Sequence, residues 1–576
     1  MVTFAQKHAR DDSMIVASNQ SPMESERVLT EVLVVGAGPT GLALATDLLR
    51  HGISVRIIDV ADKPSELSRA VVVLPRTIEE FRLRGMHERL LEVSEPVHRF
   101  LSYYKDQMVF NVGYEGIHSN FNFLLNVSQC DTEAVLRDEL KRLGGEIEWG
   151  VSLNSFVDKG DAVQVQLNHP DGVSEVQEVA FMMGADGAHS TVRHGLGIEF
   201  KGGAYKDVWL LADVDIAWSL PHGNSYTFFG DDAVLAVFPM PGDRYRLYIL
   251  QPLERELGRD PTFDDIKVAV ERVIPGKCTL SNPGWMSEFH CHHRKVEHYC
   301  LPKGRIFLGG DAAHIHSPET GLGMNTGIQD SFNLAWKLAR VLRGQAPQSL
   351  LGSYDKERSY IGDEVVKFSD ITHRMMAQFS PFVRKMRSPI LRLFTKYYQR
   401  HPADMELGFQ LRIQYRASQF IENQGKPEGF HSGPVVKAGV RLPGGQVLPT
   451  HARAEVKNAI SLYDHFDPCQ YQLLVLTGPE ITDALCHELR ELLGVIAPVR
   501  DQIAPVIVSN ELADTRLGDM DATLFADPTL EYHYTCGALH GAVYVVRPDG
   551  YIGFAGHPVR ADAVATYLKK VMKDIN

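Results

Sequence analysis

The sequence has few cysteines, and it has no apolar run long enough to cross a membrane. Its seven cysteines are an odd number spread over 576 residues without a CxxC pair, which excludes a disulfide framework and favours a reducing compartment. No uninterrupted apolar run approaches the roughly 18 residues that a bilayer span needs. We therefore expect a cytoplasmic protein with no membrane span.

An excess of basic residues is also lacking. Lysine and arginine number 59 against 72 acidic residues, which gives a formal net charge of -13. Binding to a phosphate backbone calls for a basic surface, so no nucleic-acid partner is expected. Residues 1–30 are polar, without periodic apolar positions or the apolar core of a signal peptide, which indicates a disordered extension.

The most informative motif near the start of the chain is "VVGAGPTGLALATDLL" at residues 34–49. It predicts a buried strand at 31–35 that runs into a helix at 39–50. A second strand, predicted at 54–58, ends at Asp59. An acid about 20 residues beyond such glycines is placed to bind a ribose hydroxyl, so the spacing favours FAD or NAD over NADP at this site.

The glycines of the turn have separate roles in a dinucleotide-binding unit. Gly36 permits the tight turn, Gly38 lets the main chain approach a pyrophosphate, and Gly41 lets the helix pack close to the strand. Pro39 and Thr40 begin the helix, whose N-terminus would face the anion. The alternative is an ordinary glycine-rich turn. No second GxGxxG follows a strand, which argues against reductases that hold nicotinamide in a separate domain.

Two later motifs each follow an apolar strand with a Gly/Asp turn: "FMMGADGAHSTVR" at 181–193 and "GRIFLGGDAAHIHSPETGLGMNTGIQD" at 304–330. Together with the first motif, they resemble the three fingerprints of the single-component FAD-dependent aromatic hydroxylases, the group of p-hydroxybenzoate hydroxylase and phenol hydroxylase. The resemblance is strong over about residues 31–365. It implies FAD and NADPH as cofactors, and hydroxylation of an aromatic, phenolic substrate with O2 through a flavin C4a-hydroperoxide.

The third motif carries most of the implied flavin contacts. In the family the aspartate matching Asp311 bonds the ribityl chain, and an ionised carboxylate suits sugar hydroxyls because it only accepts hydrogen bonds. The glycine-rich loop that follows would stabilise the flavin edge before a helix predicted at 328–342. The remaining contacts implied in this motif are Gly310, Pro318, Gly321, Gly323, Met324 and Asn325. The loop departs from the usual Gly-Gly-Gln stretch at Thr320, Gly321 and Leu322, and it adds an acid, Glu319.

Other cofactor contacts are implied by matching segments. Asp186 and Gly187 match a motif thought to serve both FAD and NADPH, with a strand-end turn capped by the aspartate as the alternative. Arg69 matches an arginine at the cofactor, with a surface ion pair as the alternative. Gln129 would reach the FAD, and the alternative there is a helix N-terminal turn capped by Asp131.

Residues 201–299 alternate strand-like runs with Gly/Pro turns, which predicts an antiparallel sheet over the flavin. Strand alternation puts Arg246 and Tyr248 on one face. Phenol hydroxylases have an arginine and a tyrosine at the matching positions, where the tyrosine bonds the substrate hydroxyl. We therefore assign catalysis to Tyr248, tuned by Arg246, as the base or acceptor that builds phenolate character on the substrate. The alternative is an Arg/Tyr ladder on the solvent face. Val71 stands where the family has an acid.

The histidine cluster "HCHHRK" at 290–295 is not assigned to a metal. In a strand, His290 and His292 would share one face, but no second ligand pair follows at zinc spacing.

From about residue 456 the pattern of the sequence changes and predicts a separate α/β unit. This unit is similar to the thioredoxin-like domain of phenol hydroxylases. Without CxxC it cannot exchange dithiols in the thioredoxin manner, and we expect it to take part in a homodimer interface. Its predicted elements are a strand at 471–478, a helix at 484–495, a strand at 505–509, a hairpin at 541–556 and a helix at 561–573.

The predicted fold class is α/β (α+β overall), in several domains because 576 residues exceed what one core can organise. The expected domains are a disordered extension at 1–30, a Rossmann-like FAD-binding domain at 31–200 and 300–365, a substrate-binding sheet domain at 201–299, a helical linker at 366–435 and the thioredoxin-like domain at 436–576.

The motifs place a flavin but do not choose among its reactions. The same chemistry could epoxidise an alkene or dearomatise a ring. A flavin-dependent halogenase would need a Trp-x-Trp signature, which is absent. A reading of another class is a non-enzymatic flavin-bound interaction module.

Overall fold

The computed structural model describes residues 30–575, apart from residues 67, 69, 303, 378–380, 417, 427–435, 451–458, 512–514 and 574 and the side chains of 381–385. The extension expected at residues 1–30 therefore lies outside the described residues, except for Thr30. In the described part of the chain, no helix is both long and apolar enough to cross a bilayer.

A five-stranded, fully parallel sheet carries the glycine motif. Its strand order is β19-β12-β1-β2-β8. The strands are β1 (Val32–Val35), β2 (Val55–Asp59), β8 (Ile147–Trp149), β12 (Phe181–Gly184) and β19 (Ile306–Leu308). All residues of β1 are buried, as a parallel strand covered on both faces requires. The strands predicted at 31–35 and 54–58 are confirmed to within a residue.

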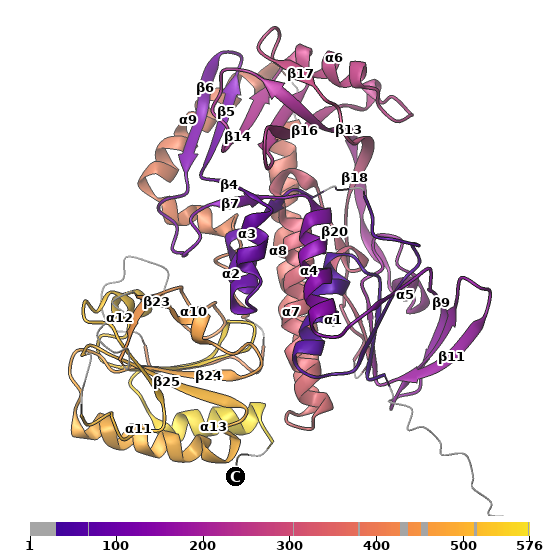
Figure 1. Cartoon of the computed structure of the whole chain (residues 1–576). Coiled ribbons are helices and arrows are strands. Elements are labelled where there is room, and N and C mark those ends of the chain that lie inside the picture. The colour runs from indigo at the N-terminus through magenta and orange to yellow at the C-terminus, as the bar shows by residue number, and fades with distance from the viewer. Residues whose placement is uncertain are drawn as a thin grey trace, which may run out of the picture.

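Helices pack along this sheet, with α1 contacting both α4 and α7. They are α1 (Pro39–Arg50), α2 (Pro75–Leu83), α3 (His87–Glu92), α4 (Gln129–Arg142), α5 (Thr191–Gly195), α7 (Leu322–Leu342) and α8 (Gly352–Ala377). Figure 1 shows α7 and α8 near the middle of the molecule, where they contact each other. Two small antiparallel sheets flank them, β3 (Val72–Val73), β7 (Leu124–Asn126) and β4 (Glu95–Val97), and β9 (Ser152–Asp158), β10 (Val163–Asn168) and β11 (Ser174–Val179).

A nine-stranded sheet forms the upper body in Figure 1. All its neighbouring strands are antiparallel except β14 and β5. The strands are β20 (His314–Ile315), β18 (Met286–Val296), β13 (Phe200–Ala217), β16 (Arg244–Pro252), β15 (Val234–Pro239), β14 (Asn224–Phe229), β5 (Arg99–Tyr104) and β6 (Gln107–Gly113), with β17 (Thr279–Ser281) on β13. The antiparallel strands predicted within 201–299 are confirmed, and two earlier strands, β5 and β6, extend the same sheet. Helix α6 (Phe263–Val273) packs near β15, and α9 (Pro381–Arg400) lies against β6.

The C-terminal body is an eight-stranded mixed sheet with order β21-β28-β27-β24-β25-β26-β22-β23. Its elements are β21 (Glu422–Gln424), β22 (Gln446–Pro449), β23 (Ile460–Ser461), α10 (Leu462–His465), β24 (Tyr471–Leu476), α11 (Asp483–Ile496), β25 (Ile503–Ser509), β26 (Thr523–Ala526), α12 (Glu531–Cys536), β27 (Ala542–Val546), β28 (Ile552–Gly556) and α13 (Ala561–Val571). The strands and helices predicted in the tail are confirmed. Helices α11 and α13 lie side by side under the sheet (Figure 1).

A buried ionic network joins the C-terminal body to the central helices. Glu357 of α8 pairs with Lys337 of α7 at 2.8 Å and with both terminal nitrogens of Arg547 at 2.9 and 3.0 Å. The side chains of all three residues are at most 2% exposed. Asn333 adds bonds to Glu357 (2.8 Å) and Asp549 (3.2 Å). Because every charge has a partner, this interface can be buried without leaving an isolated ion.

Candidate active site

The glycine turn has the geometry that its sequence predicts. Gly36 has a φ of +105°, and a Cβ atom there would overlap with the carbonyl of Ala185, which directly follows the neighbouring strand β12. A Cβ atom at Gly41 would overlap with the carbonyl oxygen of Gly36. Gly38 differs, because nothing lies within 4 Å of the position of its Cβ and it faces a cavity. The turn therefore leaves space for a ligand beside Gly38 alone.

Asp59, at the end of β2, braces this turn. Its carboxylate accepts hydrogen bonds from the backbone N–H of Ala37 at 2.7 Å and of Ala61 at 2.9 Å. It is not among the residues that line the cavity. The carboxylate has the predicted position at the strand end, and its contact with a ribose stays a prediction.

The cavity has a volume of about 810 Å³ and lies where the parallel sheet meets the nine-stranded sheet. All three sequence motifs contribute to its wall. The predicted cofactor residues that line it are Gly38, Pro39, Thr40, Gln129, Gly187, Gly310, Asp311, Pro318, Gly321, Gly323 and Met324. Of the predicted residues that the structure describes, Gly36, Gly41, Asp59, Asp186, Asn325 and Arg246 are not among the lining residues. Arg69 lies outside the described residues.

The third motif differs from its prediction in one respect: α7 begins at Leu322 and not at residue 328. Gly321, with a φ of +63°, is the residue before its first turn. Gly327 lies within α7, and Thr40 of α1 packs where its Cβ atom would lie. This glycine therefore serves close helix packing. Gly323 and Met324 consequently face the cavity from the first turn of a helix.

Asn325 holds this helix start against β3. Its side-chain amide donates to the carbonyls of Val72 (2.8 Å) and Gly321 (2.7 Å), and its oxygen accepts from the N–H of Leu74 (2.9 Å). The residue is fully buried. Asn325 thus braces the cavity wall from behind.

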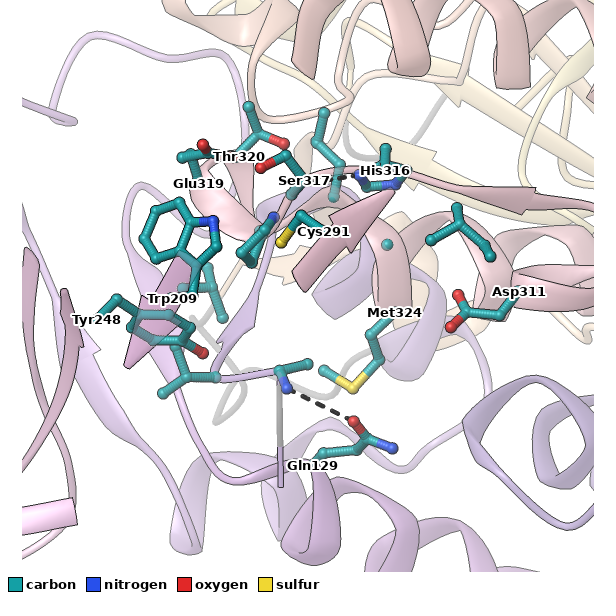
Figure 2. Close-up of a pocket in the computed structure, with 18 of the residues that line it drawn as sticks. Gln129, Trp209, Tyr248, Cys291, Asp311, His316, Ser317, Glu319, Thr320 and Met324 are labelled. Carbon is teal, nitrogen blue, oxygen red and sulfur yellow. Dashed lines mark hydrogen bonds between the residues drawn. The ribbon is translucent and has the colours of Figure 1, made fainter. Parts of the chain in front are cut away.

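Asp186 has the local role that was its alternative, whereas Gln129 lies in a helix N-terminal turn whose cap differs from the expected one. Asp186 accepts hydrogen bonds from the Ser190 hydroxyl (2.5 Å) and the Val192 N–H (3.1 Å), so it caps its own turn. Gln129 is the first residue of α4, but the cap is Ser128 and not Asp131. Gln129 still lines the cavity, where it accepts from the N–H of Ala70 at 3.5 Å (Figure 2). The cofactor contacts of Asp186 and Gln129 stay predictions.

Arg246 and Tyr248 are buried, being 1% and 5% exposed, which rules out the solvent-facing ladder. Arg246 forms a two-pronged pair with Asp213, with both bonds at 2.7 Å, and donates to the backbone oxygen of Ser68 at 2.7 Å. It also hydrogen-bonds Tyr248. Burial raises the pKa of Tyr248 to about 12, although Arg246 acts to lower it. At neutral pH the phenol is therefore a hydrogen-bond donor and not a base.

Around Tyr248 the cavity wall is aromatic and apolar. Trp209 lies edge-on to Tyr248, with ring centroids 6.3 Å apart, and parallel to Phe289 at 6.5 Å. Phe238 meets Tyr248 edge-on at 5.5 Å. Figure 2 shows Asp311 at the far end of the cavity from Tyr248 and Trp209. The cavity thus has a glycine-rich polar end and an aromatic end, which suits a flavin that meets an aromatic substrate.

Several buried polar atoms at this cavity have no partner among the described residues. They are Trp209 Nε1, Ser225 Oγ, His292 Nδ1, His316 Nε2 and Glu319 Oε2. An unpartnered buried polar atom costs about 1–3 kcal/mol, so these atoms fit a wall built for a polar ligand. Together with the open space at Gly38, they fit FAD and a substrate. No group of three or more His, Cys, Asp or Glu residues in the described ranges is arranged to hold a metal ion.

The sequence did not single out Trp209 or His373 as site residues, and it marked Glu319 only as a departure. Glu319 Oε1 hydrogen-bonds Nδ1 of His373 on α8, and Nε2 of His373 lies 3.2 Å from Asp207 on β13. Because the pairs join residues up to 166 positions apart, no local pattern could have revealed them. Burial opposes the charged ring, but the hydrogen bonds to Asp207 and Glu319 raise the pKa of His373 to about 9.

This pKa predicts how stability depends on pH. Because the pKa is raised above the ordinary 6.5, the contribution of His373 to stability is complete below about pH 6.5 and is lost as the pH rises through about 9. Between pH 7 and 9.5 we expect the free energy of unfolding to fall by about 2 kcal/mol more in the wild type than in His373→Gln. Urea unfolding at a series of pH values measures this difference.

The charged or titratable groups around His373 are Glu319, Asp207, Tyr205 and, on its own helix, Asp370. The matched control is His298→Gln, because His298 is 54% exposed beside Asp355. Equal pH slopes in His373→Gln and the wild type would contradict a charged His373.

Comparison with known proteins agrees with this geometry. The sequence model of a family described as "FAD binding domain" matches residues 29–369. The chain is 32% identical to 6-methylpretetramide 4-monooxygenase of Streptomyces rimosus, over 91% of this chain and 90% of that protein. It is 28% identical to pentachlorophenol 4-monooxygenase of Sphingobium chlorophenolicum, over 90% and 93%. The solved structure of the anhydrotetracycline hydroxylase OxyS from Streptomyces rimosus superposes with a TM-score of 0.72 at 26% identity, covering 95% of this chain and 99% of that one.

Proposed function

The chain belongs to the FAD-dependent aromatic hydroxylase family, and on that premise we propose that it uses NADPH and O2 to hydroxylate an aromatic polyketide or a simpler phenol. It is an FAD-dependent monooxygenase. The substrate class is supported by the names of its relatives, which act on 6-methylpretetramide and pentachlorophenol. The observation that carries the proposal is the meeting of all three motifs at one cavity with an aromatic end.

We propose that FAD lies along this cavity with its pyrophosphate beside Gly38 and its flavin edge at the first turn of α7. The open space at Gly38 and the orphaned polar atoms of the wall support this placement. When bound, FAD supplies the redox chemistry that takes electrons from NADPH and activates O2. The residues that would line its site are Gly38, Pro39, Thr40, Gln129, Gly187, Gly310, Asp311, Pro318, Gly321, Gly323 and Met324. Contacts of Gly36, Gly41, Asp59, Arg69, Asp186 and Asn325 with FAD stay predictions from the sequence.

Tyr248 and Arg246 would prepare the substrate. Attack on the ring is faster when the substrate hydroxyl carries phenolate character. The neutral phenol of Tyr248, polarised by the Arg246 guanidinium, can donate a hydrogen bond to the substrate oxygen and stabilise negative charge there. Arg246 keeps this orientation because Asp213 holds it from the other side. The surrounding Trp209, Phe238 and Phe289 exclude water from the reacting ring.

Replacing Tyr248 by phenylalanine is expected to lower kcat about 10- to 100-fold on a phenolic substrate, because a hydrogen bond to a charged group is worth about 1.5–3 kcal/mol. The measurement is substrate-dependent NADPH oxidation together with product formation. Tyr245→Phe is a matched control, since Tyr245 is also buried on β16 but bonds Trp218 and His222 on the other face. An unchanged rate in Tyr248→Phe would remove Tyr248 from the mechanism.

The proposed function is tested on the purified protein. A visible flavin spectrum, NADPH oxidation stimulated by a phenol, and incorporation of one atom of 18O2 into the product are the expected results. Stimulation without oxygenated product would favour an uncoupled oxidase, and no stimulation would favour a flavin-bound interaction module. The mass and structure of the product separate hydroxylation from epoxidation or dearomatisation.

We also propose the domain division drawn from the sequence, with a Rossmann-like FAD-binding domain at 31–200 and 300–365, a substrate sheet at 201–299, a helical linker at 366–435 and a thioredoxin-like unit at 436–576. A homodimer in the cytoplasm completes the proposal. The seven cysteines form no disulfide among the described residues, which fits a reducing compartment.

A further inference from the structure

Two buried polar atoms of opposite kind belong to residues that line the aromatic end of the cavity. They are Nε1 of Trp209 and Oε2 of Glu319, and neither has a partner among the described residues. Both residues line the cavity. In Figure 2, Trp209 lies between Tyr248 and Glu319. One atom can only donate a hydrogen bond and the other can only accept one.

The carboxylate of Glu319 is held in place from behind. Its other oxygen, Oε1, is bonded to His373, which is in turn bonded to Asp207. The side chains of Glu319 and His373 are 1% and 3% exposed. Next to Glu319, the Thr320 hydroxyl bonds Ser369 of α8 at 2.9 Å. Two links to α8 thus hold the segment, so that Oε2 keeps its orientation.

The ligand group that suits both atoms is a hydroxyl. Its oxygen can accept from the Trp209 N–H, while its proton is donated to Glu319. An ether oxygen could accept from Trp209 but would leave Oε2 of Glu319 without a donor. A buried carboxylate oxygen without a donor is costly, so the pair discriminates in favour of the hydroxyl.

We propose that Trp209 and Glu319 form a second polar subsite of the active site, which binds a hydroxyl group of the aromatic substrate other than the one that meets Tyr248. The proposal rests on the proposed function and narrows its substrate class. The preferred substrate carries hydroxyl groups at two separate places on a fused aromatic skeleton. His373 is a positioning residue in this subsite, because it acts through Glu319.

The test compares two probes that differ in one proton donor, 1,5-dihydroxynaphthalene and 5-methoxy-1-naphthol. Their dissociation constants for the FAD-loaded enzyme are measured by calorimetry. We expect the wild type to bind the diol about 10- to 100-fold more tightly, as a charge-assisted hydrogen bond implies. In Glu319→Gln the amide oxygen stays with His373 and the NH2 group faces the cavity, so the preference for the diol is lost.

Trp209→Phe separates the two halves of the subsite. It removes the N–H that donates to the hydroxyl oxygen of the diol or to the ether oxygen of the methoxy probe. Both probes should therefore bind about tenfold more weakly, and the ratio of their dissociation constants should stay unchanged. Trp218→Phe is the control, because Trp218 packs against Tyr226 and Tyr245 and is not among the residues lining the cavity.

The outcomes separate this inference from the function on which it rests. Equal affinities in the wild type, binding of neither probe, or a diol preference that survives in Glu319→Gln would overturn the subsite. If neither probe stimulates NADPH oxidation or gives oxygenated product, the failure belongs to the proposed function, whereas the binding constants still judge the subsite.

Discussion

Replacing Glu357 by glutamine is expected to lower the free energy of unfolding by about 3–5 kcal/mol. The substitution keeps the size of the side chain but removes the negative charge that pairs with Lys337 and Arg547. Two buried cations would then face each other without this partner. Burial already lowers the pKa of Lys337 to about 8 even with Glu357 present, so the loss would push this lysine toward its neutral form. Urea unfolding followed by far-UV circular dichroism measures the change.

Glu364→Gln is the matched control, because Glu364 lies on the same helix but is 52% exposed beside Lys367. A surface pair of this kind is worth about 0–1 kcal/mol, so the control should remain close to wild type. Similar losses in the two variants would mean that the interface between the C-terminal body and the central helices does not depend on the charge of Glu357.

Alanine at two glycines of one turn is expected to give opposite results. Gly41→Ala should lower the free energy of unfolding by about 3 kcal/mol or more, because its Cβ would overlap with the backbone of Gly36. Gly38→Ala should change stability by less than about 1 kcal/mol, since its φ of -76° suits alanine and nothing lies within 4 Å. Its methyl group instead enters the space proposed for the pyrophosphate, and we expect FAD to bind about 10- to 100-fold more weakly.

Stability is measured on the apoprotein, and FAD affinity by titration of flavin fluorescence. Gly494→Ala in α11 is the control: its Cβ also meets nothing within 4 Å, so FAD affinity should not change and helix propensity should add up to about 1 kcal/mol of stability. Full FAD affinity in Gly38→Ala would show that the pyrophosphate does not lie beside this residue.

Much of the fold followed from local pattern. The strand, glycine turn and helix at residues 31–50 and the elements of the tail were predicted because apolar periodicity and turn residues act over short distances. The start of α7 was predicted wrongly because it depends on a contact between distant segments. Gly327 resembles a loop residue in sequence, but it is required by contact with Thr40, which comes from a different motif.

The parts of the site formed by backbone at glycine turns could be predicted from the sequence. The contacts between side chains from distant segments were harder to predict. Asp186 and Gln129 lie at the predicted turns, yet their side chains also bond to nearby residues. The apposition of Trp209 with Tyr248 and Glu319 joins β13, β16 and the segment before α7. The contact between these side chains depends on how the nine-stranded sheet packs over the parallel sheet. The apolar periodicity of the sequence does not predict that packing.

The guanidinium of Arg246 has a mechanical consequence. It donates hydrogen bonds to the backbone oxygens of Ser68 and Ala70 and also hydrogen-bonds Tyr248. The N–H of Ala70 in turn donates to the side-chain oxygen of Gln129. The side chain of Arg246 therefore links Tyr248, which lies at the aromatic end of the cavity, to the segment of Ser68 and Ala70 beside the proposed flavin. If a bound substrate ring displaces Tyr248, Arg246 would transmit that displacement to Ser68 and Ala70. Substrate binding at the aromatic end would then shift the segment beside the proposed flavin without any motion between whole domains.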